Sequence, residues 1–296
     1  MLSTSFCNIC VTFIESLANF AEKAYTERRT TSKKGGNPMY RYETHMHTCQ
    51  GSACGTSTGA EHARHYKAQG YQGIFITDHF FGGNTAAPRT GKWKDRIDWF
   101  CSGFEDAWNE GQRIGLDVFF GWEQNYQGDE YLIYGLDKQF LLDHPEIEHW
   151  TRREQFEQIH AAGGCVIQAH PFRMRGYLNA IRVCELYADG IEVANAGNTP
   201  AQDAYAARYC KARGIYTTAG SDNHRSKADT VLYGVGLDKP IDSPADWVQH
   251  ILTRQPHTLI VPEGRFDGDP TVEPLLPSYW YNEQEEFVNL PMDWLK

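Results

Sequence analysis

Short extended runs alternate with helical stretches from about residue 39 to residue 260, and this alternation constrains the fold most. Strands are predicted at Met39–Met46, Gly73–Thr77, Asp117–Trp122, Tyr131–Leu136, Cys165–Ala169, Gly190–Val193, Ile215–Ala219 and Val231–Gly236. Helices are predicted at 59–69, 93–113, 151–162, 199–213 and 244–253, several of them followed by a glycine suited to a helix C-cap. Strands that alternate with helices predict a parallel sheet, and about 225 residues of this pattern suffice for an α/β barrel.

Three segments are predicted along the chain. Residues 1–37 are expected to form an amphipathic helix followed by a polar linker that Gly and Pro close. Residues 38–262 hold the alternating pattern and form the main domain. Residues 263–296 are acidic, contain Pro and aromatic residues, and are expected to be an irregular tail that straps across the domain or is partly loose.

Charge and cysteine usage narrow the functional classes. The net charge of −10 argues against broad electrostatic binding to nucleic acid or to an anionic membrane. The apolar part of residues 5–21 is too short and too interrupted to span a bilayer. The eight cysteines show no disulfide framework, so we expect reduced thiols and a cytoplasmic protein. Cys7 and Cys10 have the spacing of a redox or zinc pair, although two small apolar residues on one helix face is the favoured interpretation.

Imidazole and carboxylate side chains fall at the ends of five predicted strands. They are His45 and His47, His79, Glu123, His170, and Asp222 with His224. The C-terminal ends of parallel strands meet at one mouth of a barrel, so these side chains are expected to lie together. Any single histidine among them would more often be a packing or surface residue, but five segments that agree in position predict a metal site.

Five motifs resemble those of the PHP family, which is named for bacterial polymerases and histidinol phosphatases. They are Glu43–Thr48, Ile76–His79, Gly121–Glu123, Gln168–Pro171 and Ala219–His224, and the resemblance runs from about Tyr40 to about Val261. It implies a distorted seven-stranded, TIM-like β/α barrel with two or three divalent ions, commonly zinc, manganese or iron. It also implies that His45, His47 and Asp222 hold a first ion, that Glu123 bridges to a second bound by His170, and that His79 and His224 hold a third.

Two segments depart from the family pattern and leave the number of ions open. Many members place an Asp or His for the third ion a few residues after the first motif. Here that segment reads Cys49–Gly55, where Cys54 is either a thiolate ligand that favours zinc or iron, or a small residue in a tight loop. Members also often carry a His on the strand after the bridging Glu, whereas Tyr131–Tyr134 occupy that strand.

The resemblance implies a metal-dependent phosphoesterase, a hydrolase that cleaves a small phosphorylated molecule with a metal-bound hydroxide. Asp222, Glu123 and Arg173 are the predicted catalytic residues, with Arg173 as the preferred phosphate contact. The alternatives are a nuclease or exonuclease acting on single-stranded nucleic acid, and a metal-binding regulatory module without turnover. No polymerase-sized extension or basic stripe supports nucleic acid as a partner. The sequence leaves the substrate and the oligomeric state undetermined.

Overall fold

The computed structural model describes residues 39–228, 230–270 and 275–295, and residues 39–296 form one compact unit. The predicted N-terminal helix and linker at 1–37 lie outside the described residues. No helix in the described part of the chain has both the length and the apolar character needed to cross a bilayer. The six cysteines of these same ranges are all free thiols.

Most predicted elements are present, with shifted ends. The strands are β1 (Tyr40–Glu43), β2 (Gly73–Ile76), β3 (Asp117–Tyr126), β4 (Asp129–Tyr134), β5 (Cys165–Ala169), β6 (Ile181–Val183), β7 (Gly190–Asn195), β8 (Thr217–Gly220), β9 (Gly234–Leu237), β10 (Thr258–Ile260), β11 (Ser278–Tyr281) and β12 (Phe287–Asn289). The α-helices are α2 (Gly59–Ala68), α3 (Trp93–Ile114), α4 (Lys138–Asp143), α5 (Arg152–Ala161), α6 (Pro200–Arg213) and α7 (Pro244–Leu252), with 3-10 turns η2 (Pro145–His149), η3 (Glu185–Tyr187) and η5 (Asp293–Leu295).

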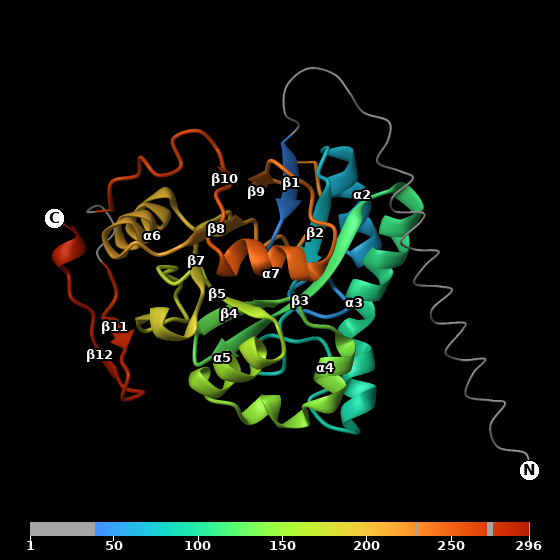
Figure 1. Ribbon diagram of the computed structural model, residues 1–296, viewed down its shortest axis with the longest axis horizontal. Coiled ribbons are helices and arrows are strands. Elements are labelled where there is room, and N and C mark those ends of the chain that lie inside the picture. Colours follow the sequence, from blue (N-terminus) through green and yellow to red (C-terminus); the bar gives the residue numbers. More distant parts are fainter. Residues whose placement is uncertain (1–38, 229, 271–274, 296) are drawn as a thin grey trace, which may run out of the picture. The chain divides into compact units, whose positions relative to one another are not determined.

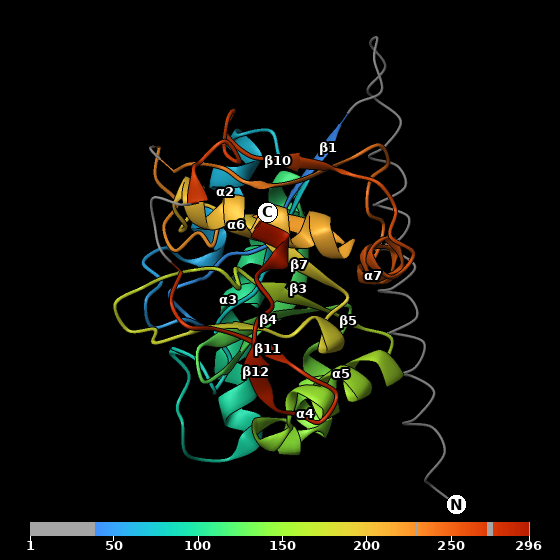
Figure 2. The same ribbon diagram turned by 90° about the vertical axis from the view of Figure 1, so that its left-hand side faces the viewer.

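The main sheet has the strand order β10-β9-β1-β2-β3-β4-β5-β7-β8 and curves into a nearly closed barrel. The end of β8 meets the end of β1, because Met46 forms a parallel bridge with Asn223 and the His47 amide donates to the Asn223 carbonyl at 2.9 Å. Seven strands therefore follow one another around the barrel, and β9 and β10 extend from the edge of β1. The predicted distorted, TIM-like α/β barrel is confirmed. Figures 1 and 2 show α2, α3, α5, α6 and α7 around the outside of this sheet.

The prediction of a wholly parallel sheet is wrong at two places. β4 pairs antiparallel with both β3 and β5, and β9 pairs antiparallel with β1 and with β10. β3 and β4 are joined by only Gln127 and Gly128, whose φ values are 54° and 102°. Positive φ at both loop residues is the geometry of a tight β-hairpin, which has no room for a helical crossover. The hairpin matters for the site because it lays β4 directly beside the strand that carries Glu123.

Capping side chains and glycines mark the ends of several helices. Thr58, Thr151, Thr199 and Ser243 each cap a helix N-terminus through a capping box. Gly115 and Gly214 end α3 and α6 in the left-handed conformation, at φ 72° and 65°. The long helix α3 buries Ile97, Phe100 and Ala107 against the barrel. These packed elements hold the strand ends, and therefore the candidate site, in fixed positions.

The expectation of an irregular tail is only partly correct. β11 and β12 form an antiparallel pair, and β11 also pairs in parallel with β6, so that the three make a second sheet. Trp294 in η5 packs against Phe172, Tyr205 and Tyr209. The tail, red in Figure 1, runs along the side of the domain that carries α6, and Figure 2 looks onto this side.

Candidate metal centre

All seven side chains predicted to bind metal lie together at one mouth of the barrel. They come from the segment after β1, the segment after β2, the middle of β3, the residue after β5 and the turn after β8: His45, His47, His79, Glu123, His170, Asp222 and His224. Together with Glu130, they form four overlapping sets of three, whose ligand atoms lie within 4.8 Å of one another: His45, His47 and Glu123; His45, His170 and Asp222; His79, Glu123 and Glu130; and His47, His79 and His224. His170 and Asp222 have positive φ values of 29° and 54°, and strained backbone of this kind is typical of functional sites.

The first group surrounds the imidazoles of His45 and His47. Their Nε2 atoms are 3.1 Å apart, and Asp222 Oδ1 lies 3.0 Å from Nε2 of His47 and 3.6 Å from Nε2 of His45. Glu123 Oε1 lies 3.2 Å from Nε2 of His45. Two histidines at positions i and i+2 of an extended segment point the same way, which explains how one strand end supplies both rings. Four ligand atoms thus converge around one position.

The second group includes a residue that the sequence analysis missed. Glu123 Oε1 lies 3.3 Å from His170 Nε2, and Oε2 of Glu130 lies 3.6 Å from the same nitrogen. Glu130 pairs with Asn125 across the β3–β4 hairpin, so it shares a face with Asn125 and Glu123. A carboxylate therefore stands on the strand where the family pattern has a histidine. The hairpin motif was the available signal, since a two-residue turn at Gln127 and Gly128 places Glu130 opposite Asn125.

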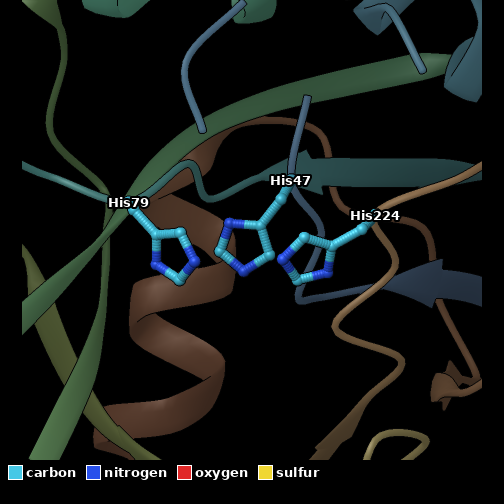
Figure 3. A group of neighbouring side chains, drawn as sticks. All are labelled: His47, His79 and His224. Atoms are coloured by element: carbon cyan, nitrogen blue, oxygen red, sulfur yellow. The ribbon is translucent and has the colours of Figure 1, made fainter. Parts of the chain in front are cut away.

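The third group is formed by three stacked imidazoles. The ring of His47 lies between those of His79 and His224, with centroid distances of 4.1 and 4.4 Å. Figure 3 shows the three rings side by side, each from a different segment of the chain. Cys54 joins this group, because its Sγ lies 3.0 Å from His224 Nε2. Burial raises the pKa of the Cys54 thiol, but hydrogen bonds with His224 and His79 outweigh burial and lower it to about 6.

Opposed charges keep the two central carboxyl groups ionised. Burial alone would raise the pKa of Glu123, but His79 and His45 hold it well below its ordinary value. Burial acts in the same way on Asp222, where Arg173 and His45 outweigh it and hold the pKa well below its ordinary value. The pKa of His47 is held well below its ordinary value by burial and by repulsion from His79 and His224. Neutral imidazole and ionised carboxylate are the forms that bind metal ions.

Two buried polar atoms at the centre lack hydrogen-bond partners among the described residues. They are His79 Nδ1 and Glu123 Oε2, which lie 2.5 Å apart without the geometry of a hydrogen bond. Leaving such atoms unsatisfied costs about 1–3 kcal/mol each. A cation bound beside them would satisfy both. The donor set, made of imidazole nitrogens and carboxylate oxygens, also suits zinc, iron or manganese, so these residues fit divalent metal ions.

A ring of hydrogen bonds behind the cluster links two of the predicted ligands. His45 Nδ1 lies 3.0 Å from Glu192 Oε1, and Asn195 Nδ2 donates to Glu192 Oε2 at 2.8 Å. Arg173 Nη2 donates both to Asn195 Oδ1 at 2.6 Å and to Asp222 Oδ2 at 2.7 Å. Histidines that bind metals usually have such a carboxylate behind the ring, which fixes their orientation. The ring of contacts therefore sets the positions of His45 and Asp222 together.

A second network fixes His47 and His79 from the other side. Ser52 Oγ donates to Asp78 Oδ1 at 2.7 Å, lies 3.1 Å from His47 Nδ1, and accepts from the His79 amide at 2.9 Å. Asp78 also accepts from the amide and hydroxyl of Thr48 at 2.6 and 2.7 Å. Burial raises the pKa of Asp78 to about 6 against the effect of these hydrogen bonds. The network joins the segments after β1 and β2 into one rigid unit.

The predicted phosphate contact, Arg173, lies at the edge of the cluster and is largely buried. Its Nε donates to Asn198 Oδ1 at 3.0 Å, in addition to the two bonds from Nη2. With His170, Glu130 and Tyr177 it lines a pocket beside the site. The structure therefore places Arg173 next to the candidate metal centre, where its Nε and Nη2 donate to Asn198, Asn195 and Asp222.

Comparison with known proteins finds a similar fold among solved structures. Neither a protein-family model nor a curated protein matches the sequence. A solved two-domain protein from Bacteroides vulgatus, described as containing a predicted PHP-like metal-dependent phosphoesterase, matches with a TM-score of 0.56 and 14% identity over 76% of this chain. The match covers 65% of that protein's length, which is less than two thirds of it.

Two other solved structures match with lower TM-scores. PsfC from Pseudomonas syringae has a TM-score of 0.48 at 15% identity, over 77% of this chain and 94% of its own. An amidohydrolase from Chromobacterium violaceum, solved with bound sulfate and no metal, has a TM-score of 0.43 at 15% identity, over 72% of this chain and 96% of its own. The match to the Bacteroides vulgatus protein shows a shared fold.

Proposed function

We propose that this chain is a metal-dependent hydrolase of the PHP type that cleaves a phosphoester in a small molecule. The observation that carries the proposal is the convergence of eight imidazole and carboxylate side chains, from six segments of the chain, at one mouth of the barrel. The likeness of the fold to the Bacteroides vulgatus protein supports it, because that protein is described as containing a PHP-like metal-dependent phosphoesterase.

His45, His47 and Asp222 would hold one divalent ion. Glu123 would bridge to a second ion, because its Oε1 lies 3.2 Å from a nitrogen of His45 and 3.3 Å from one of His170. Glu130, which groups with His79 and Glu123 and lies 3.6 Å from His170 Nε2, would complete the second site. Bound divalent ions lower the pKa of a water ligand and neutralise developing charge on the phosphoryl oxygens.

The protein side chains orient and neutralise the reacting groups. Arg173 is placed to do two things: it holds Asp222 through Nη2, and it brings a guanidinium to the pocket that Tyr177 and His170 line. A guanidinium has five N–H donors, so a partner at Asp222 leaves capacity for a phosphate oxygen. Glu192 and Asn195 hold the side chains of His45, a proposed metal ligand, and Arg173, the proposed phosphate contact, in fixed positions relative to each other.

A small substrate is favoured over nucleic acid. The net charge is −10, and the described pocket beside the site contains two arginines among its lining residues, together with Asp129 and Glu130. A strand of nucleic acid requires a continuous basic groove along its backbone. Positive charge at the mouth is local, which suits one phosphoryl group.

The test combines metal analysis with a substrate panel. Purified protein is assayed for bound metals, and then on phosphomonoesters, small phosphodiesters and single-stranded oligonucleotides with and without a chelator. We expect hydrolysis of a small phosphoester that the chelator abolishes and that added zinc, manganese or iron restores. Loss of activity in His45→Ala, with activity retained in His144→Ala, whose imidazole pairs with Glu146 outside the site, would assign turnover to this centre.

Other outcomes would overturn the proposal. Hydrolysis confined to oligonucleotides would identify a nuclease instead. Metal bound in less than one equivalent per chain, together with no activity on any phosphoester, would identify a regulatory metal-binding module. Full activity in the His45→Ala variant would remove this cluster as the site of the reaction.

A further inference from the structure

Cys54 lies in a tight loop that presents its sulfur to the third group of ligands. The loop runs from the end of the first motif to the start of α2, and Cys54 Sγ lies 3.0 Å from His224 Nε2. Cys54 is partly buried, in contrast to the exposed Cys49 in the same loop. One interpretation of the sequence treats Cys54 only as a small residue in a tight turn, and such a residue has no need to face an imidazole.

The backbone of the loop is fixed on both sides of Cys54. The Gly55 amide donates to the Ser52 carbonyl at 3.0 Å, and the Thr56 amide donates to the carbonyl of His224 itself at 2.8 Å. Gly55 permits this close approach, because a Cβ there would lie 2.4 Å from the Thr48 carbonyl oxygen. The sulfur and the imidazole of His224 are therefore held together by the fold.

The surroundings of the sulfur point to a cation. The imidazoles of His47, His79 and His224 have ligand atoms within 4.8 Å of one another, and His79 Nδ1 is buried without a hydrogen-bond partner among the described residues. A lone Cys–His pair would also suit a nucleophile and its base. Here a second imidazole, that of His79, stands beside the pair, and imidazoles gathered around a thiolate are a typical binding site for a divalent metal ion.

We propose that Cys54 is a metal ligand as a thiolate, and that with His79 and His224 it forms a sulfur-containing site at one end of the centre. This inference rests on the proposed function, and it specifies which metal that part of the centre selects. On binding, the thiol proton leaves to solvent and a metal–sulfur bond forms. Thiolate and imidazole ligands favour zinc or ferrous iron over manganese, whereas the neighbouring carboxylates of Glu123 and Glu130, which group with His79, offer oxygen.

The test is the absorption spectrum of the metal-free protein as cobalt(II) is added. A thiolate bound to cobalt produces an intense near-ultraviolet charge-transfer band, whereas cobalt bound only by imidazole and carboxylate produces weak visible bands. We expect the intense band in the wild type and its loss in Cys54→Ser. It should persist in Cys49→Ser, which alters the exposed cysteine of the same loop, and in the Cys7→Ser/Cys10→Ser double variant.

A second variant separates loss of the sulfur from loss of folding. Cys54→Asp offers an oxygen ligand at the same position, so it should keep the cobalt stoichiometry of the wild type while losing the charge-transfer band. Its preference should shift from zinc toward manganese in a competition measured by elemental analysis. Both readouts are independent of enzymatic activity.

The outcomes also separate this inference from the proposed function. Cobalt bound with visible bands but without the charge-transfer band in the wild type would overturn the sulfur site and leave a metal-dependent enzyme in place. A charge-transfer band that survives in Cys54→Ser would do the same. Failure of the wild type to bind any cobalt, zinc or manganese would overturn both.

Discussion

Arg173 Nη2 lies 2.7 Å from Asp222 Oδ2, and the two side chains are only 10% and 8% exposed. The pair joins the predicted phosphate contact to a predicted metal ligand. Because the same nitrogen also donates to Asn195, which in turn donates to Glu192 behind His45, the arginine connects two candidate ligands, Asp222 and His45. Arg173 therefore positions residues of the candidate metal centre, in addition to its proposed contact with substrate.

Replacing Arg173 tests this double role. Arg173→Ala leaves the Asp222 carboxylate buried without its partner, which typically costs about 3–5 kcal/mol of folding free energy. We expect weaker metal binding in chelator competition as well as lower activity. Arg173→Lys keeps the charge but loses the planar fork, so it should restore part of the stability and less of the metal affinity. A rise in KM with unchanged metal affinity and stability would leave only the substrate contact.

Glu192→Gln tests the carboxylate behind His45. The substitution keeps the shape of the side chain but removes the charge that lies 3.0 Å from His45 Nδ1. Changes at such positions typically weaken metal affinity or activity by about 10–100-fold. We expect a loss of this size in metal affinity by chelator competition. Glu146→Gln, on an exposed 3-10 turn, serves as the control, and equal affinities in the two variants would contradict the prediction.

Glu130 is expected to be a ligand of the second ion. Glu130→Ala should bind one ion fewer per chain than the wild type, because His170 and Glu123 alone leave that position under-coordinated. Glu130→His should recover the ion, since imidazole is the ligand that the family pattern places on this strand. Elemental analysis after dialysis measures both. An unchanged metal content in Glu130→Ala would show that Glu130 only neighbours the site.

His257, which is not one of the candidate ligands, should make the free energy of unfolding depend on pH. Burial, with repulsion from His250, lowers the pKa of His257 from 6.5 to about 4 in the folded protein. Between about pH 6.5 and pH 4 the unfolded chain binds a proton that the folded chain does not, so the free energy of unfolding falls as pH falls. His257→Gln should show a shallower decline across this window, measured by urea unfolding of chelator-treated protein. Parallel curves would contradict the assignment.

Arg265 from the C-terminal tail is expected to stabilise the turn that supports the site. It donates to Asp203 Oδ2 at 2.7 Å and to the carbonyl of Asn198 at 2.7 Å, and Asn198 in turn accepts from Arg173. Asp203 is fully buried, so Arg265→Ala should destabilise the protein by about 3–5 kcal/mol. Metal affinity should fall with it, because the Asn195–Asn198 turn loosens. A variant with wild-type thermal stability would show that the tail does not support the site.

The positions of most candidate ligands could be predicted from the sequence because they depend on local features. Apolar runs locate the strands. A side chain that directly follows a strand in a β/α barrel lies at the mouth of the barrel, whatever the order in which the strands pair. The positions of His45, His79 and His170 at the mouth could be predicted from this rule alone. The seven-stranded barrel followed from the resemblance of the motifs, and the alternation of strands with helices agreed with it.

The remaining features depend on pairings between residues distant in the chain, which local patterns do not encode. Glu130 became a candidate ligand only through the register of the β3–β4 hairpin, and the tail acquired a strand because β11 pairs with β6 about a hundred residues earlier. The sequence left two interpretations of Cys54 open, and the tertiary structure decides its surroundings, because the distance between its sulfur and His224 is set by how two loops pack. The sequence determines which candidate ligand side chains are present. The tertiary structure determines which of them lie close together, because that depends on how segments distant in the chain pack.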